Sequence, residues 1–301
     1  MLHVHQEVSA LKNGPADRIT LLAINLMLLA LVVVTLYPLL HVIFASFSSP
    51  AEIVSHRGLL WKPLGFSLEA YKLVFADPRV YIGYRNTLFI VIVGVALNLL
   101  MTAIGAYVLS RKNVMWNKFF MIMATFTMFF SGGLVPLYLV VKGVGLTNTL
   151  WSTILPFAIS TFNLIVMRTS FQSIPDSLEE SAKIDGANHL VILFRIVIPL
   201  SLPVLAVMGL YYAVEKWNGW FYASIFIQQQ ELFPLQIYLR EILILSSTDT
   251  LSSGAAVGEQ FQIGATIKYA TIMVATVPIL CVYPFIQRFF VKGVMIGALK
   301  G

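Results

Sequence analysis

The sequence predicts an all-α integral membrane protein with six transmembrane helices, on three observations. Of its 301 residues, 58% are hydrophobic and only 11% are charged, whereas soluble domains carry about 25% charged residues. Apolar runs of the length that crosses a hydrocarbon core about 30 Å thick recur along the chain. These runs do not alternate in polarity from residue to residue, as the strands of a membrane barrel would.

The apolar segments set the expected domain organisation. The six predicted spans are residues 19–44, 86–109, 119–141, 151–171, 198–222 and 269–290. The first run is longer than the roughly 7–15 residues of a signal-peptide core, so we expect it to be retained as a span. Residues 1–18 are then an amino-terminal tail, 19–290 the transmembrane domain and 291–301 a carboxyl-terminal tail.

The basic residues predict the orientation of the spans. Among the short connections, 110–118 holds Arg111, Lys112 and Lys118, whereas 142–150 holds only Lys142. Because cytoplasmic loops are enriched in Lys and Arg, we expect both termini in the cytoplasm. The net charge of +6 is spread between apolar runs, which favours membrane orientation and contact with lipid over nucleic-acid binding.

The outer side is expected to carry two long segments, about 45–85 and 223–268. Both contain Pro, Gly and Ser and have room for short helices.

Several kinds of chemistry find no support in the sequence. The single cysteine, Cys281, allows no intrachain disulfide and no thiolate cluster, and the five histidines are scattered. We therefore predict no metal site and no catalytic residues. No G-x-x-x-x-G-K-[ST] sequence occurs, so the chain lacks the usual loop that holds ATP phosphates.

The segment between the fourth and fifth spans predicts a short helix outside the membrane. Ser173 is the expected N-cap, Pro175 lies in the first turn, and acidic residues follow near the positive end of the helix dipole. Gly186 is the expected terminator, so the pattern is helix, glycine, helix.

This short helix has a small apolar stripe beside an acidic flank. Ile174, Leu178 and Ala182 recur every four residues. Such a helix suits docking in a groove of another protein. The alternative, a helix lying on lipid, is disfavoured because such helices carry Lys and Arg toward anionic headgroups.

A family resemblance rests on this segment. Permeases of binding-protein-dependent ABC importers share the pattern Glu-Ala-Ala, three residues, Gly, nine residues, Ile-x-Leu-Pro. The matching positions here are Glu180, Ser181, Ala182, Gly186, Ile196, Ile198 and Pro199. Ser181 replaces Ala and Ile198 replaces Leu, and both changes conserve size. Asp185 and Pro203 further resemble the carbohydrate-uptake, maltose-type branch.

The resemblance implies a type I importer fold and a set of partners. Residues about 175–189 would be the coupling helix, which docks on one of two ATP-binding cassette ATPase subunits, where ATP and Mg are bound. A second, homologous permease would complete a heterodimer, and an extracytoplasmic solute-binding protein would deliver the solute. The implied location is the bacterial inner membrane, and the chain itself would not be an enzyme.

The resemblance also bears on the solute. The segment Phe233–Gln236 and the ending Lys292–Gly301 are similar to a subgroup of sugar permeases that imports acidic oligosaccharides such as alginate. The implied cargo is a carbohydrate, an oligosaccharide, and within this subgroup an acidic one.

Polar residues within the spans are candidates for the solute path. These are Asn98, Asn163, Glu215, Lys216 and Asn218. Embedded charges tend to face water or a partner. Hydrogen bonds between helices remain the alternative for the two deeper asparagines, and anchoring at the headgroups for the group near 215–218.

Two rival functions are open at this stage. An ion-coupled secondary carrier would also have several spans, but such carriers show paired broken helices and more embedded carboxylates. A membrane-embedded enzyme would need a Ser/His or H-E-x-x-H arrangement. Uptake that requires ATP and a binding protein, rather than a proton gradient alone, would discriminate the importer from the carrier.

Overall fold

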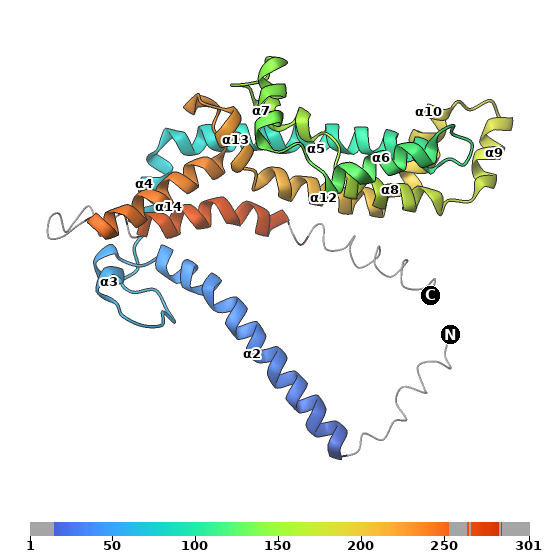
Figure 1. Cartoon of the computed structure of the whole chain (residues 1–301). Helices are drawn as coiled ribbons and strands as arrows, with labels where there is room; N and C mark the ends of the chain where they lie inside the picture. The colour runs from blue at the N-terminus through green and yellow to red at the C-terminus, as the bar shows by residue number, and fades with distance from the viewer. Residues whose placement is uncertain (1–14, 253–263, 265, 283, 285–301) are drawn as a thin grey trace. The chain divides into compact units, whose positions relative to one another are not determined.

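The computed structural model describes residues 15–252, 264, 266–282 and 284, and the fold is helical throughout (Figure 1). Within these residues one isolated antiparallel bridge joins Ser48 and Phe66. The chain divides into two compact units, Met1–Leu73 with Gly254–Met273, and Val74–Ser253 with Val274–Gly301. The all-α prediction is confirmed.

Unit 1 is dominated by a long apolar helix. Helix α2 (Pro15–Ser46) contains an apolar stretch whose side chains are not buried within the protein. A helix apolar on every side needs lipid or another protein around it. The following segment contains α3 (Pro50–Ser55) and folds back on the end of α2, where Ser67 N–H donates to Phe47 O at 2.9 Å.

Unit 2 holds most of the remaining elements, after α4 (Glu69–Ala76), which runs from one unit into the other. In order they are α5 (Pro78–Ser110), α6 (Asn117–Phe129), α7 (Leu134–Gly143), the 3-10 turns η1 (Leu150–Thr153) and η2 (Leu155–Phe157), α8 (Thr161–Gln172), α9 (Asp176–Ile184), α10 (His189–Ile192), the π-helical turn η3 (Leu193–Val197), α11 (Ile198–Leu200), α12 (Leu202–Trp217), α13 (Phe221–Phe226), the 3-10 turn η4 (Gln230–Leu232) and α14 (Leu235–Ser252). A further apolar helix covers Thr266–Val282.

The predicted spans correspond only partly to single helices. Among the described residues, α2 and α5 are each long and apolar enough to cross a membrane. The third, fourth and fifth predicted spans are bent helix pairs, with angles of 115° between α6 and α7, 49° before α8 and 86° before α12. Gly133, with φ +87°, forms the first break. The count of six spans stays a prediction.

The helix that contains the second predicted span starts earlier than expected. The second span starts at Pro78 rather than at residue 86, because Asp77 caps the helix and proline suits its first turn. The outer segment 223–268, with room for short helices, contains the short turn η4 and the 18-residue helix α14. The carboxyl-terminal tail 291–301 and residues 1–14 lie outside the described residues.

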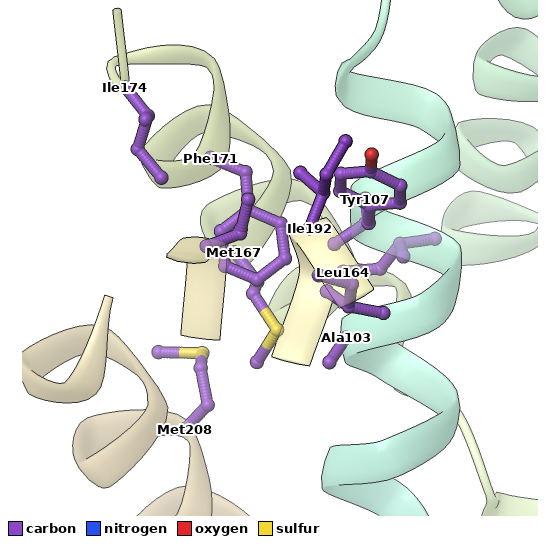
Figure 2. Close-up of a cluster of buried hydrophobic side chains, with 11 residues drawn as sticks. Ala103, Tyr107, Leu164, Met167, Phe171, Ile174, Ile192 and Met208 are labelled. Carbon is purple, nitrogen blue, oxygen red and sulfur yellow. The ribbon is translucent and has the colours of Figure 1, made fainter. Parts of the chain in front are cut away.

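A buried cluster joins four helices of unit 2. Figure 2 shows its side chains pointing toward one another from α5, α8, α10 and α12. The labelled members are Ala103, Tyr107, Leu164, Met167, Phe171, Ile174, Ile192 and Met208. Because lipid is as apolar as these side chains, close packing rather than removal from water holds such helices together. The cluster makes these helices one packed block that reaches the segment before α9.

The other end of α5 is fixed by polar contacts with the segment that leads into α14. Asn86 Nδ2 donates to the carbonyls of Glu231 and Phe233, at 2.9 and 3.1 Å. The Leu235 N–H donates to Thr87 Oγ1 at 2.9 Å. Helix α5 therefore extends from this contact to the cytoplasmic connection predicted at 110–118.

A charged cluster caps the start of α5. Asp77 Oδ1 accepts from the Arg79 N–H at 2.9 Å, and Oδ2 accepts from Arg79 Nη2 and from the Tyr238 hydroxyl, both at 2.7 Å. The hydrogen bonds from the Arg79 side chain lower the pKa of the Asp77 carboxyl to about 2, against the opposing effect of burial and with further help from Tyr238. The folded protein therefore stabilises the ionised form of the Asp77 carboxyl.

Asp77→Asn tests this cluster through its pH dependence. The folded-state pKa lies below the unfolded one, so the stabilisation is complete above about pH 4 and is lost as the pH falls through about 2. At neutral pH the variant should be less stable by about 1 to 2 kcal/mol, measured by thermal unfolding in detergent. The gap to the wild type should close on acidification, and parallel pH profiles for both proteins would contradict the assignment.

Candidate functional site

Helix α9 lies at one end of α5 and α8 (Figure 1). It begins at Asp176, with Pro175 as the N-cap residue. The prediction of Ser173 as N-cap was wrong, because Ser173 closes α8 instead: its N–H donates to Ser170 O at 3.1 Å and its hydroxyl donates to the same oxygen at 2.7 Å. Pro175 separates the two helices.

The end of α9 has the predicted glycine turn. Gly186 has φ +79°, a conformation that other residues adopt at a cost. The Gly186 N–H donates to Lys183 O at 3.0 Å and the Ala187 N–H to Ala182 O at 2.9 Å, which is the Schellman arrangement. Asn188 then caps α10 by accepting from the Val191 N–H at 2.9 Å. The helix, glycine, helix pattern is confirmed.

A buried ion pair ties α9 to the end of α5. Arg111, the C-cap residue of α5, pairs through Nη1 with Glu179 Oε1, and their side chains are only 15% and 6% exposed. The guanidinium also lies over the Tyr107 ring, 4.8 Å from its centre. Removing one partner of a buried ion pair is strongly destabilising, because the remaining charge stays buried without compensation. Glu179 is therefore the acidic residue of α9 that is fixed by a buried contact.

Neighbouring side chains satisfy the carbonyls that α5 leaves free at its end. Arg168 Nε donates to Leu109 O at 2.7 Å. Asn117 Nδ2 donates to Leu109 O at 3.0 Å and to Arg111 O at 2.8 Å. Since the last carbonyls of a helix have no partner within it, these bonds fix the chain direction after Ser110 and so the position of Arg111.

A cavity of about 600 Å³ lies between the end of α5, α9 and α10. Its lining includes Tyr107, Arg111, Lys112, Asp176, Glu179, Glu180, Lys183 and His189. The Tyr107 hydroxyl and His189 Nδ1 are 3.1 Å apart and share a hydrogen bond. At the exposed edge, Lys112 Nζ donates to Asp176 Oδ2 at 2.9 Å, which holds the pKa of that carboxyl below its usual value. Two ion pairs, one buried and one exposed, thus join α9 to the residues directly after α5.

The predicted coupling residues differ in their exposure and in the element on which they lie. Glu180, Ser181, Asp185 and Gly186 are exposed, while Ala182 is half-buried against the cluster of Figure 2. Ile196 lies in the π-helical turn η3 and Pro199 in α11. Proline lacks the N–H that would bond the carbonyl four residues earlier. The missing N–H of Pro199 therefore accounts for the irregular, π-helical turn that precedes it.

Sequence reasoning missed the buried partners Arg111 and Glu179. Glu179 was grouped with the exposed acids of the flank, and Arg111 was counted only as an orientation signal. A basic residue directly after an apolar run, facing a locally acidic segment, is the signal that points to this pair.

The candidate path residues also lie in different surroundings: two line a cavity, two are buried and one is exposed. Glu215 and Lys216 line a second cavity of about 150 Å³, together with Ile90, Thr153, Phe157, Gly219 and Tyr222. Asn98 and Asn163 are buried, and Asn98 Nδ2 donates to Phe157 O at 3.2 Å. Asn218 is exposed and donates to Val214 O in its own helix. Among the described residues, no three His, Cys, Asp or Glu side chains gather as a metal would require.

Comparison with known proteins gives consistent relatives over nearly the whole chain. Residues 100–296 match the model of the binding-protein-dependent transport system inner membrane component. The polygalacturonan/rhamnogalacturonan transport system permease protein YtcP of Bacillus subtilis is 43% identical over 279 residues, covering 91% of this chain and 96% of the relative. Protein LplC of Bacillus subtilis is 41% identical over 295 residues, covering 98% and 99%.

A solved structure shares the fold of this chain. It belongs to a bacterial ABC transporter involved in the import of the acidic polysaccharide alginate, with a TM-score of 0.84 and 32% sequence identity, covering 92% of this chain and 98% of the matched one.

The buried ion pair predicts an asymmetric pattern of stability. Arg111→Met or Glu179→Met should each lower the free energy of unfolding by about 3 to 5 kcal/mol, because each leaves one buried charge alone. The double variant Arg111→Met with Glu179→Met should recover a large part of that loss. Thermal unfolding of the purified protein in detergent measures all three.

The matched control is the exposed pair. Lys112→Met should change stability little, since exposed ion pairs contribute little. Losses that add up in the double variant, or a control as damaging as Arg111→Met, would contradict the role assigned to the buried pair.

Proposed function

Because this chain belongs to the family of inner-membrane components of binding-protein-dependent transport systems, we propose that it is the permease subunit of an ABC importer for an oligosaccharide, driven by ATP hydrolysis in partner subunits. One observation carries the coupling part of this proposal: α9 is fixed to α5 on one side and exposed on the other. The inner membrane is the location that the family description gives.

The exposed side of α9 supports docking on an ATPase subunit. Of the predicted apolar stripe, Ile174 and Ala182 pack against the cluster of Figure 2, whereas Leu178 is 43% exposed. Ile184 is 87% exposed, and the helix also carries exposed Glu180 and Lys183. Apolar side chains exposed on a charged helix outside the membrane are suited to a groove in another protein. Residues about 175–189 are in this proposal the coupling helix, with ATP and Mg bound by two partner ATPases.

The buried side supports the transmission of motion. When the ATPase pair closes on ATP, a docked α9 moves, and the Arg111–Glu179 pair pulls the end of α5 with it. Helix α5 packs against α8 and α12 in the cluster of Figure 2, so the motion passes to the packed block. Rigid elements that shift together between two arrangements are the usual basis of alternating access.

The proposal includes the remaining partners and the orientation. A second, homologous permease completes a heterodimer, and an extracytoplasmic solute-binding protein delivers solute to the segments about 45–85 and 223–268. Both termini are cytoplasmic. In support, α9 and the Asn86–Glu231 contact lie toward opposite ends of α5, as coupling and delivery on opposite membrane faces require.

The proposed cargo is an acidic oligosaccharide. One relative is named for the transport of polygalacturonan and rhamnogalacturonan and the solved structure for the import of alginate, which are all chains containing uronate sugars. Uptake of trigalacturonate into vesicles that contain the reconstituted importer should require both ATP and the binding protein. Uptake driven by a proton gradient alone would contradict the proposal.

Gly186→Val tests the coupling role of α9. Valine at a left-handed position costs about 1 to 2 kcal/mol or more and should misdirect α9, so solute-stimulated ATP hydrolysis and uptake should fall at least tenfold while insertion in the membrane is kept. Gly186→Asn should retain most activity, because Asn tolerates this conformation. Charge reversal by Glu180→Lys should weaken coupling in the same way.

The control variant is Gly145→Val. Gly145, with φ +73°, ends α7 in the same arrangement, with Gly145 N–H donating to Lys142 O and Leu146 N–H to Val141 O. Valine at position 145 would cause the same kind of backbone strain as valine at 186, but on the predicted outer side. ATP hydrolysis should therefore stay coupled to uptake in Gly145→Val. Normal coupling in Gly186→Val, or equal damage in both variants, would overturn the assignment of α9.

A further inference from the structure

Lys216 is a charged side chain in a buried position. It is 8% exposed in the last turn of α12, and its ammonium donates to Thr153 O at 3.2 Å. An ammonium has three N–H donors, and within the described part of the chain this carbonyl is its hydrogen-bond partner. Burial of a charge is costly unless it is paired, and among the described residues this ammonium has one acceptor and no ion-pair partner.

The neighbouring carboxylate, Glu215, lines the same cavity but forms no direct ion pair with Lys216. Glu215 is exposed, and none of the ion pairs among the described residues includes Lys216. Successive residues of a helix point in different directions, which explains why the adjacent charges do not meet. Among the described residues, the ammonium therefore has no direct ion-pair partner.

The position of the lysine stem is set by a glycine on α5. A Cβ atom at Gly94 would lie 2.5 Å from Lys216 Cδ and 2.6 Å from Cε, and 3.6 Å from Ile154 Cγ1. Glycine thus leaves the space in which the lysine stem lies, and along this course the ammonium reaches Thr153 O.

The ammonium lies at a cavity with an aromatic wall. The rings of Phe157 and Tyr222 are 4.5 Å apart between centres, and both residues line the 150 Å³ cavity with Lys216. Apolar and aromatic walls with a few placed polar groups are typical of ligand sites. Since enclosed sites for drug-sized ligands measure about 300 to 1,000 Å³, this cavity takes one group of a longer molecule.

The cavity lies toward the proposed outer half of the helices. Ile90 and Gly94 follow Asn86 and Thr87, which bond the segment leading into α14, by about one to two helical turns. A solute arriving from outside would meet this cavity early on its way inward.

We propose that Lys216 binds a carboxylate of the transported oligosaccharide and thereby makes this permease favour uronate-containing chains. The inference rests on the proposed function and adds to it the residue that recognises the negative charge of the solute. A carboxylate would supply acceptors for the two remaining N–H groups and the missing counter-charge. Charge-assisted hydrogen bonds of this kind are worth more than neutral ones.

The test uses the complete importer in vesicles with saturating binding protein loaded with trigalacturonate. Uptake and ATP hydrolysis are measured in the same vesicles. Lys216→Met and Lys216→Gln should each lower uptake at least tenfold while hydrolysis stimulated by the binding protein stays within about threefold. Lys216→Arg should retain most uptake. Lys142→Met, which removes an exposed lysine of α7, is the matched control and should behave as the wild type.

The outcomes separate this inference from the proposed function. Wild-type vesicles that take up no trigalacturonate would overturn the proposed cargo. Normal uptake by Lys216→Gln would overturn the need for charge, and an equal fall of uptake and hydrolysis in Lys216→Met would show that the lysine is structural.

A second variant tests the position of the ammonium. In the otherwise wild-type protein, Gly94→Ala should displace the flexible stem of Lys216 and lower uptake. In the Lys216→Met background the same substitution should cause no further loss of uptake. Independent losses in the two backgrounds would overturn the placement of Lys216 by Gly94.

Discussion

The arrangement depends most on one buried contact, the ion pair between Arg111 and Glu179. Charges this well buried persist because each compensates the other, and the bonds from Arg168 and Asn117 fix the chain on which Arg111 lies. Without the pair, α9 would be attached to the packed helices by its two ends, by the half-buried Ala182 and by the exposed Lys112–Asp176 pair. With it, a helix outside the apolar block becomes part of that block, and its exposed face is left free for a partner.

Much of this architecture could be predicted from the sequence. Composition and run length predicted the helical membrane fold, and the positive φ of Gly186 follows from a pattern that only glycine meets easily. The bends between α6 and α7 and before α12 could not be predicted, because proline and glycine are tolerated in membrane helices and packing decides where they bend. The motif also directed attention to Glu180, although the residue held by the fold is Glu179.

The two cavities were unpredictable for a different reason. Each depends on residues far apart in the sequence, such as Gly94 and Lys216, whose contact exists only once α5 and α12 have packed. Sequence placed Lys216 among the candidate path residues on charge alone. Burial and the glycine opposite it supply the physical reason for that choice, whereas Asn98 and its bond to Phe157 O fit a contact between helices.

The central claim is that α9 moves together with α5 when the ATPases close. Spin labels on Val108→Cys of α5 and Lys183→Cys of α9, in a Cys281→Ser background that removes the exposed native thiol, give this distance by pulsed electron paramagnetic resonance. The account predicts the same narrow distance distribution in the nucleotide-free and the ATP-bound importer. A shift of several ångströms or a broadening on ATP binding would contradict it.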